Sequence, residues 1–183
     1  MTDLDLNSLF QEKLKALKPY QMENFDCKIK LHANENPFTP PKEIQVLFEN
    51  SLKEINLNRY PDPDSRNLKA ILSKRLGVSS EMLVIGNGSD ELIQLLLQIF
   101  CGPEDTIAFP DPTFSMYSIL AKGMGIHPLP IPLNKNWDFE GEHFLEVAIK
   151  HNARLIFISY PNNPTGNCFS EKSTQKIIEY FQG

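Results

Sequence analysis

The sequence predicts an α/β protein built on a partial, mostly parallel sheet with helices on both faces. Apolar runs typical of strands occur at Thr106–Phe109, Ile126–Leu133 and Arg154–Tyr160, and segments with helical spacing separate them. Strands that alternate with helices pair in parallel, and the helices then cover both faces of the sheet. With 41% apolar residues in a chain of 183, there is enough apolar material for such a core.

The N-terminal part of the chain predicts helices without strands. Apolar residues at helical spacing predict a helix over Asp5–Lys18, which is either a docked arm or an ordinary surface helix. Pro41 suits the first position of a second helix, which continues to Ile55. A third helix is expected over Leu68–Leu76, because Gly77 is a typical C-terminal stop.

The remaining elements complete the alternation. A short strand is expected at Met82–Ile85, followed by a helix over Leu92–Phe100 that is apolar nearly all round and should therefore be buried. Further helices are expected at Phe114–Lys122, Glu140–Lys150 and Glu171–Phe181. Ligands of such sheets bind at the carboxyl ends of the strands, so the loops that follow the strands are the candidate sites.

Composition and charge argue against several classes of protein. A net charge of −5 is unlike that of a dedicated nucleic-acid binder. No apolar run reaches the roughly 18 residues of a membrane span, and the acidic N-terminus is unlike a targeting peptide. The 4 histidines and 3 cysteines show no spacing typical of a metal site. Scattered cysteines indicate reduced thiols, so we expect a cytoplasmic protein without a metal, membrane or nucleic-acid partner.

The first candidate site is the glycine-rich turn Gly86–Glu91, between an expected strand and an expected helix. Its glycines allow close backbone approach to a ligand, and the free N–H groups at a helix start favour a phosphate. The alternative is a simple turn in which Ser89 or Asp90 caps the helix. The P-loop is excluded because no lysine follows Gly88, and the dinucleotide fingerprint because its third glycine is absent.

Two further candidates follow expected strands. The segment Tyr160–Gly166 combines two prolines, either of which could be cis, with two asparagine amides on a rigid backbone. A Pro/Asn turn is the alternative, but it explains the whole segment poorly. Phe114, at the expected start of a helix, either presents its flat face to a ring ligand or packs in the core.

Six segments together resemble the fold-type-I pyridoxal-phosphate aminotransferases, and most closely the histidinol-phosphate aminotransferases. They occur in the family's order and cover nearly the whole chain: Lys18–Gln21, Leu31–Pro37, Arg59–Pro63, Gly86–Glu91, Pro112–Tyr117 and Pro161–Gly166. Each segment alone is weak evidence, but the ordered set is specific. The resemblance implies an incomplete large domain of this fold and pyridoxal phosphate as the cofactor.

The resemblance also implies roles for residues around the cofactor. Gly88, Ser89 and Asp90 match the positions that hold the cofactor phosphate. Phe114 matches the aromatic residue that stacks on the pyridine ring, a position that is often tyrosine in the family. Asn163 matches the asparagine that donates a hydrogen bond to the ring oxygen.

Three further residues match positions outside this cluster. Tyr60 matches a tyrosine that reaches the phosphate of the neighbouring subunit, which implies a homodimer. Tyr20 and Asn34 match residues near the substrate. The resemblance further implies an N-terminal arm and helix over residues 1–58, and the first part of the cofactor-binding large domain over residues 59–183.

The Schiff-base lysine of the family is not expected in this chain. In the family, this lysine, the carboxylate partner of the pyridinium and a substrate-binding arginine all follow the segment that matches Pro161–Gly166. We therefore expect an N-terminal half without a catalytic residue that is inactive alone, with a homodimer or a complementing C-terminal chain as its partner. Ser73 and Lys74 resemble the family's Ser-Lys motif but precede the phosphate loop, so Lys74 is expected to be solvated. Without later strands, the helix over Leu92–Phe100 should lose part of its cover.

The implied reaction passes an amino group between glutamate and imidazole-acetol phosphate, in histidine biosynthesis. A related aminotransferase acting on aromatic amino acids, or a threonine-phosphate decarboxylase of the same fold, is the alternative within this class. A non-catalytic fragment that binds a phosphate-bearing ligand through Gly86–Asp90 is the alternative outside it.

Overall fold

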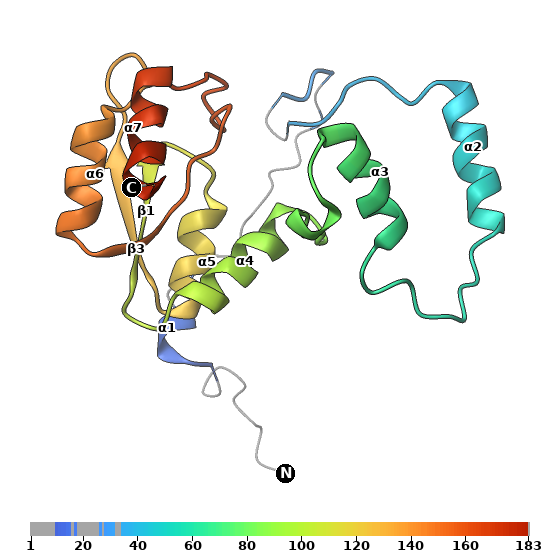
Figure 1. Ribbon diagram of the computed structural model, residues 1–183, viewed down its shortest axis with the longest axis horizontal. Coiled ribbons are helices and arrows are strands. Elements are labelled where there is room, and N and C mark those ends of the chain that lie inside the picture. Colours follow the sequence, from blue (N-terminus) through green and yellow to red (C-terminus); the bar gives the residue numbers. More distant parts are fainter. Residues whose placement is uncertain (1–9, 16, 18–25, 27, 32–33, 183) are drawn as a thin grey trace, which may run out of the picture. The chain divides into compact units, whose positions relative to one another are not determined.

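The computed structural model describes residues 10–15, 17, 26, 28–31 and 34–182, whose elements Figure 1 shows. The chain divides into two compact units. The sheet unit comprises Met1–Lys18 and Gly86–Gly183, and the helical unit comprises Pro19–Ile85. The expected division of the whole protein between residues 58 and 59 stays a prediction.

The sheet unit contains the expected parallel sheet. Its strands are β1 (Thr106–Asp111), β2 (His127–Pro132) and β3 (Ala153–Ile156), in the order β2-β1-β3. Both neighbours of β1 run parallel to it. The central strand is therefore the first in sequence, and each connection to the next strand carries a helix (Figure 1).

Helices cover both faces of this sheet. Helices α4 (Ser89–Phe100) and α5 (Met116–Met124) pack on one face, and α6 (Gly141–Lys150) and α7 (Glu171–Gln182) on the other (Figure 1). The core on the α4 side consists of Ile93, Leu97, Ile107, Phe109, Tyr117, Ala121 and Ile126. The core on the α6 side consists of Ala108, Ile131, Phe139, Phe144, Leu145, Ala148, Phe169 and Ile177. The expected α/β architecture with two covered faces is confirmed.

The two cores follow from the alternation of side chains along β1. Successive residues of a strand point to opposite faces of the sheet. Ile107 and Phe109 accordingly join the core on the α4 side, and Ala108 joins the core on the α6 side. Because both faces are covered, this strand is a continuous apolar run in the sequence rather than an alternating one.

A proline determines where the pairing of β1 with β3 stops. The Phe157 N–H donates a hydrogen bond to the Ala108 carbonyl (2.9 Å), so Ala108 and Pro110 face β3. Pro110 has no N–H with which to continue the ladder. Strand β3 ends at Ile156 for this reason, and the expected extension of the strand to Tyr160 is wrong.

Prolines also close the outer edge of β2. The N–H groups of His127 and Leu133 donate to the carbonyls of Asp105 and Asp111, both at 2.8 Å, so the residues at even positions between them face away from β1. These residues are Pro128, Pro130 and Pro132. Since proline carries no N–H, β2 offers no backbone donor on its outer side.

Met82–Ile85 does not form the expected strand. Ser80–Met82 is instead a short 3-10 helix, in which the Ser79 hydroxyl accepts a hydrogen bond from the Glu81 N–H (3.4 Å). The sheet formed by the described residues consists of β1, β2 and β3, and Met82–Ile85 is not part of it. A strand needs a neighbour for its backbone groups, and none of these strands provides one.

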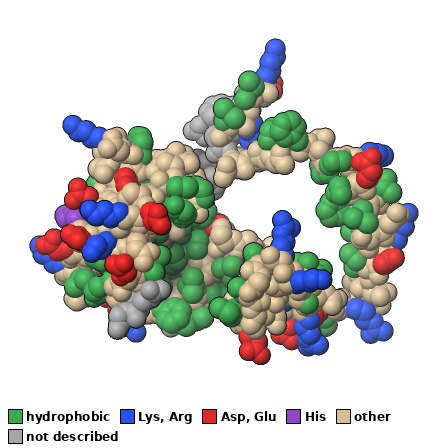
Figure 2. All heavy atoms as spheres, turned by 45° about the horizontal axis from the view of Figure 1, so that its top comes forward, with side chains coloured by type: hydrophobic (Ala, Val, Ile, Leu, Met, Phe, Trp, Pro, Cys, Tyr) green, Lys and Arg blue, Asp and Glu red, His purple; other side chains and the backbone are tan. Residues whose placement is uncertain are grey.

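The burial expected for the helix over Leu92–Phe100 is wrong for one of its sides. Helix α4 buries Ile93 and Leu97 against α5. The exposed apolar side chains on this helix are Leu95, Leu96, Ile99 and Phe100. These side chains are exposed in the described chain, and the reason expected for it, the absence of later strands, stays a prediction. Figure 2 shows that exposed hydrophobic side chains occur on other described parts of the chain as well.

The helical unit contains α2 (Lys42–Lys53) and α3 (Arg66–Leu76), neither of which has a buried residue. Gly77 ends α3 in the left-handed conformation (φ 70°), as expected for a C-terminal stop. Pro41 precedes α2 as its N-cap, whereas the sequence placed it inside the first turn.

The N-terminal helix is shorter than expected where the structure describes it. Helix α1 (Glu12–Lys15) belongs to the sheet unit, and the preceding residues Phe10 and Gln11 are not helical. The residues of the expected helix before Phe10 lie outside the described part of the chain. Among the helices of the described ranges, none is long and apolar enough to cross a membrane.

Candidate cofactor site

The glycine-rich turn leads directly into α4, as expected. The helix begins at Ser89, and Gly88 is its N-cap with φ 84° and no side-chain cap hydrogen bond. Ser89 and Asp90 therefore lie in the first helical turn, and the alternative in which one of them caps the helix is wrong. The N–H groups of a first turn have no partner within the helix, so they remain available to an anion.

Close packing holds the first residues of this turn. The Glu91 carboxylate accepts a hydrogen bond from the Asn87 N–H. A Cβ on Gly86 would lie 2.8 Å from Leu92 Cδ2, so a larger residue there would displace the Leu92 side chain. The turn is thus tied to α4 before Gly88, while the exposed residues Ser89 and Asp90 follow.

Phe114 lies between β1 and α5, before the helix rather than in it. Helix α5 begins at Met116, so the expected helix start at Phe114 is wrong. The Phe114 ring meets Tyr117 edge-on, with centroids 5.7 Å apart, and Tyr117 stacks on Phe157 at 4.9 Å. Phe114 nevertheless stays half-buried. The contact with Tyr117 holds the Phe114 ring against the core, and part of the ring remains accessible to a ligand.

Burial raises the pKa of the Tyr117 hydroxyl, although a hydrogen bond with Ser159 acts in the opposite direction. This hydroxyl consequently stays protonated at neutral pH. Tyr117 therefore contributes a neutral, packed support for Phe114 and no charge to the site.

The two asparagines of the segment after β3 differ in environment. The Tyr160–Pro161 and Asn163–Pro164 peptide bonds are both cis. The Asn162 side chain is buried, with 2% of its surface exposed. Asn163 is half-buried, and within the described residues its side-chain amide makes no hydrogen bond. The Asn163 amide is therefore the one available to a ligand.

The buried asparagine connects the loop after β3 to the loop after β1. The Thr113 hydroxyl donates to Asn162 Oδ1 (2.7 Å), and Asn162 Nδ2 donates to the Pro112 carbonyl (3.0 Å). Asn162 Nδ2 also donates to Thr165 Oγ1 (2.7 Å). The sequence analysis gave Asn162 no separate role. The only feature that could have pointed to one is its position next to Asn163.

The structure thus brings together the loops that carry Phe114 and Asn163. The Arg154 guanidinium, at the start of β3, donates to the carbonyl of Phe100 at the end of α4 (2.5 Å). The N-terminus of α4 with Ser89 is the end remote from this contact. No hydrogen bond or ion pair in the described ranges joins Ser89 to the other two loops, so its place in a common site stays a prediction.

Tyr60, Asn34 and Tyr20 belong to the helical unit. Tyr60 is fully exposed. Asn34 is exposed and has a left-handed backbone (φ 54°), which asparagine tolerates. Tyr20 lies outside the described residues.

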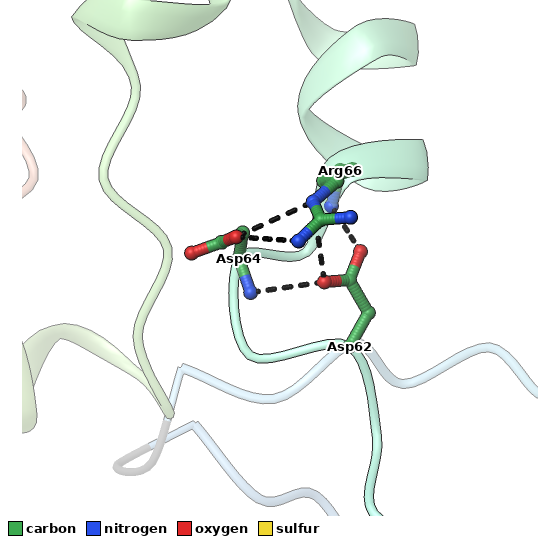
Figure 3. A network of polar contacts seen from close by, with 3 residues as sticks. All are labelled: Asp62, Asp64 and Arg66. Carbon is green, nitrogen blue, oxygen red and sulfur yellow. Dashed lines mark hydrogen bonds and ion pairs between the residues drawn. The ribbon is translucent and has the colours of Figure 1, made fainter.

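A charged network holds the turn after Tyr60 (Figure 3). The Asp62 carboxylate accepts hydrogen bonds from the backbone N–H groups of Arg66 (2.8 Å) and Asp64 (3.1 Å). The Arg66 guanidinium donates to the Asp64 carboxylate (3.0 Å). Asp62 thereby serves the start of α3 in place of the N-cap residue Ser65, which makes no side-chain cap hydrogen bond.

We expect Asp62→Asn to weaken the start of α3 at neutral pH. The backbone N–H groups of Arg66 and then Asp64 lower the pKa of Asp62 from its usual 3.8. A carboxylate with a lowered pKa stabilises the folded state above its unfolded-state pKa, and this contribution is lost as the pH falls through the lowered value. The protection factors of the α3 amides, which are exchange rates corrected for the intrinsic effect of pH, should therefore fall below pH 3.8 in the wild type and change less in Asp62→Asn.

Asp64→Asn is the matched control, because the Asp64 side chain accepts only from the exposed Arg66 guanidinium. It should keep the pH dependence of the wild type. Identical exchange profiles for Asp62→Asn and wild type would show that Asp62 does not cap α3.

Three further observations concern the thiols, Lys74 and the side chains that could bind a metal. Cys101 and Cys168 are free thiols, and burial raises the pKa of Cys101. Lys74 is exposed on α3, as expected for a solvated lysine. No cluster of three or more histidine, cysteine or acidic side chains suited to a metal ion occurs in the part of the chain that the structure describes.

A parallel sheet between two helical layers, with an open helix N-terminus and polar loops after its strands, defines an α/β protein of the type that holds phosphate-bearing cofactors. The sequence matches the family of class I and II aminotransferases over residues 26–183. The chain belongs to this family.

Curated relatives are histidinol-phosphate aminotransferases. That of Caldanaerobacter subterraneus subsp. tengcongensis is 36% identical over 97% of this chain and 51% of the relative. That of Flavobacterium johnsoniae is 38% identical over 100% of this chain and 50% of the relative. The chain spans about half the length of the curated relatives it matches. The expected similarity to this group is confirmed.

Solved structures show the same fold. Histidinol-phosphate aminotransferase from Sinorhizobium meliloti, in complex with pyridoxal-5'-phosphate, has a TM-score of 0.71 at 21% identity and covers 82% of this chain and 39% of its own. The histidinol-phosphate aminotransferase from Clostridium acetobutylicum has a TM-score of 0.65 at 27% identity. The match covers 83% of this chain and 42% of the Clostridium chain. Pyridoxal phosphate, the expected cofactor, is thus the cofactor of a protein with this fold.

Proposed function

We propose that this chain forms the phosphate- and ring-binding part of a pyridoxal-phosphate site in a histidinol-phosphate aminotransferase. The reaction would transfer an amino group between glutamate and imidazole-acetol phosphate, in histidine biosynthesis. The single observation that carries the proposal is the hydrogen-bonded pair of loops after β1 and β3. One loop presents the half-buried Phe114 ring, and the other an Asn163 amide without a hydrogen bond in the described ranges.

The residues present fit this cofactor. The backbone N–H groups of Ser89 and Asp90, after Gly88, would hold the phosphate, and the Ser89 hydroxyl would add a donor. Phe114 would cover one face of the pyridine ring, and Asn163 would donate to the ring oxygen. When bound, pyridoxal phosphate supplies an electron sink for the bonds at the substrate's α-carbon, while the chain orients the ring and excludes water.

The proposal includes further partners and limits. Tyr60, whose ring is fully exposed, would contact the cofactor phosphate of the neighbouring subunit in a homodimer. Tyr20 and Asn34 would lie near the substrate. The enzyme would be cytoplasmic. None of the three segments that form the proposed site contains a lysine. We therefore expect these 183 residues by themselves to lack transaminase activity.

The test is a calorimetric titration of the chain with pyridoxal phosphate. Asn163→Ala should weaken binding about 10- to 100-fold, because a hydrogen bond to a charged oxygen contributes about 1.5–3 kcal/mol. Asn67→Ala, a matched change at an exposed position on α3, should bind like the wild type. After treatment with one equivalent of pyridoxal phosphate, borohydride reduction should label no single lysine selectively, since the exposed lysines react without preference.

Two results would contradict the proposal in different ways. Absence of pyridoxal-phosphate binding by the wild type would remove the cofactor site. Selective labelling of one lysine, lost in Asn163→Ala, would leave the site in place but remove the reason for the expected inactivity of the chain.

A further inference from the structure

We infer that Asn162 is a positioning residue for the cofactor contacts, because it joins the loop of Phe114 to the loop of Asn163. This inference rests on the proposed function, which assigns the ring contacts to those two residues. It assigns to Asn162 a task that neither the resemblance nor the sequence pattern gave it.

The first argument is the burial and bonding of the Asn162 side chain. Only 2% of the residue's surface is exposed. Its Oδ1 accepts from the Thr113 hydroxyl (2.7 Å), and its Nδ2 donates to the Pro112 carbonyl (3.0 Å) and to Thr165 Oγ1 (2.7 Å). A buried amide with these partners has one stable orientation, since a flipped amide would face a carbonyl with its oxygen.

The second argument is the position of the partners in the chain. Pro112 and Thr113 immediately precede Phe114, and they lie 50 and 49 residues from Asn162. Two segments so far apart in sequence have no local reason to keep a fixed separation. The Asn162 side-chain amide fixes their separation, because it forms hydrogen bonds with both segments.

The third argument is that Asn162 also closes its own loop. The Gly166 N–H donates to the Asn162 carbonyl (2.7 Å), and the Asn162 N–H donates to the Asn167 carbonyl (2.8 Å). Asn163 lies inside the loop closed by these bonds. Its backbone is consequently held at the residue before it and at the residues that follow it.

These contacts divide the work between two adjacent asparagines. The side-chain amide of Asn162 is hydrogen-bonded within the protein and is not available to a ligand. Asn163 keeps its amide free of hydrogen bonds in the described residues, at a place set by Asn162. A ring clamped by Phe114 and contacted by Asn163 requires both groups at a fixed separation, which a single buried amide maintains.

The experiment compares Asn162→Ala with Asn163→Ala. In the free chain, hydrogen exchange should accelerate at both loops in Asn162→Ala, including the amides of Tyr117 and Gly166, which donate to the carbonyls of Phe114 and Asn162. In the complex, Asn162→Ala should weaken pyridoxal-phosphate binding about 10-fold or more, the loss expected for a hydrogen bond to a charged group. The absorbance titration of the bound ring hydroxyl should shift to higher pH, as in Asn163→Ala, because the donor that favours its ionised form is misplaced.

A milder variant covers the case in which Asn162→Ala does not fold. Thr113→Val removes only the hydroxyl that donates to Asn162 Oδ1, and it should produce smaller changes in the same directions. Thr106→Val is its matched control, at the opposite end of β1, and should leave binding and titration unchanged. A residue that only supported the fold would lower the unfolding temperature and leave both the affinity and the titration of the folded complex unmoved.

The outcomes separate this inference from the proposed function. If the wild type does not bind pyridoxal phosphate, both are overturned. If the wild type binds and Asn163→Ala weakens binding, but Asn162→Ala and Thr113→Val bind and titrate like the wild type, the inference alone is overturned. Faster exchange in one loop only, with the other unchanged, would also overturn it.

Discussion

Phe144→Ala is expected to lower the free energy of unfolding of the sheet unit by about 3–5 kcal/mol, the range typical of a buried phenylalanine. Phe144 is 0% exposed, on α6, and its ring lies 5.1 Å from that of Phe139. Phe139 in turn meets Phe169 at 4.8 Å. Removing Phe144 leaves a cavity beside these rings, and the sheet prevents the helices from closing it. Urea unfolding monitored by circular dichroism measures the change.

Phe181→Ala is the matched control for this prediction. The Phe181 ring is 66% exposed, near the end of α7, and touches Tyr180. Its removal should change the free energy of unfolding by no more than about 0.5 kcal/mol. Equal effects of the two substitutions would show that the core on the α6 side is not packed as described.

Gly141→Ala is expected to destabilise the sheet unit by about 1–3 kcal/mol, although alanine is the better helix former by about 1 kcal/mol. Gly141 begins α6 where α7 approaches closely. A Cβ there would lie 2.6 Å from the Ser173 carbonyl oxygen and 2.8 Å from Lys176 Cβ. Since the first of these atoms is backbone, α7 must move away from α6. Thermal and urea unfolding both measure the loss.

Gly123→Ala should have the opposite sign. Gly123 lies within α5, and its added Cβ would meet Leu17 Cδ1 at 3.7 Å, an ordinary contact. Helix propensity then dominates, and we expect a gain of up to about 1 kcal/mol. A loss at Gly123 equal to that at Gly141 would mean that helix packing does not distinguish the two positions.

Much of the fold could be predicted because the spacing of apolar residues is a local property. The spacing located α5, α6 and α7 to within a few residues, and Gly77 marked the end of α3. The wrong predictions concern strand pairing and helix burial, which depend on other parts of the structure. Met82–Ile85 has the composition of a strand but no strand beside it, and α4 has apolar residues on a side that the described residues leave uncovered.

The candidate site could be predicted as a set of loops but not in its internal division of roles. Asn162 and Asn163 have the same side chain and adjacent positions. The difference between them is created by Pro112 and Thr113, which approach only in the folded chain. No local pattern reports such a contact. The sequence therefore identified the residue proposed to face the cofactor and missed the one that holds it in place.

The alternating prolines of β2 determine at which edge a further strand can join the sheet. Pro128, Pro130 and Pro132 present no amide hydrogen on the outer side of β2, so a newcomer strand cannot complete a ladder there. Strand β3 (Ala153–Ile156) contains no proline and is the other border of the sheet. Any polypeptide that enlarges this sheet, whether covalently linked or added in trans, must enter at β3. An engineer who wishes to rebuild a larger enzyme around this chain has one border to match and can leave the other untouched.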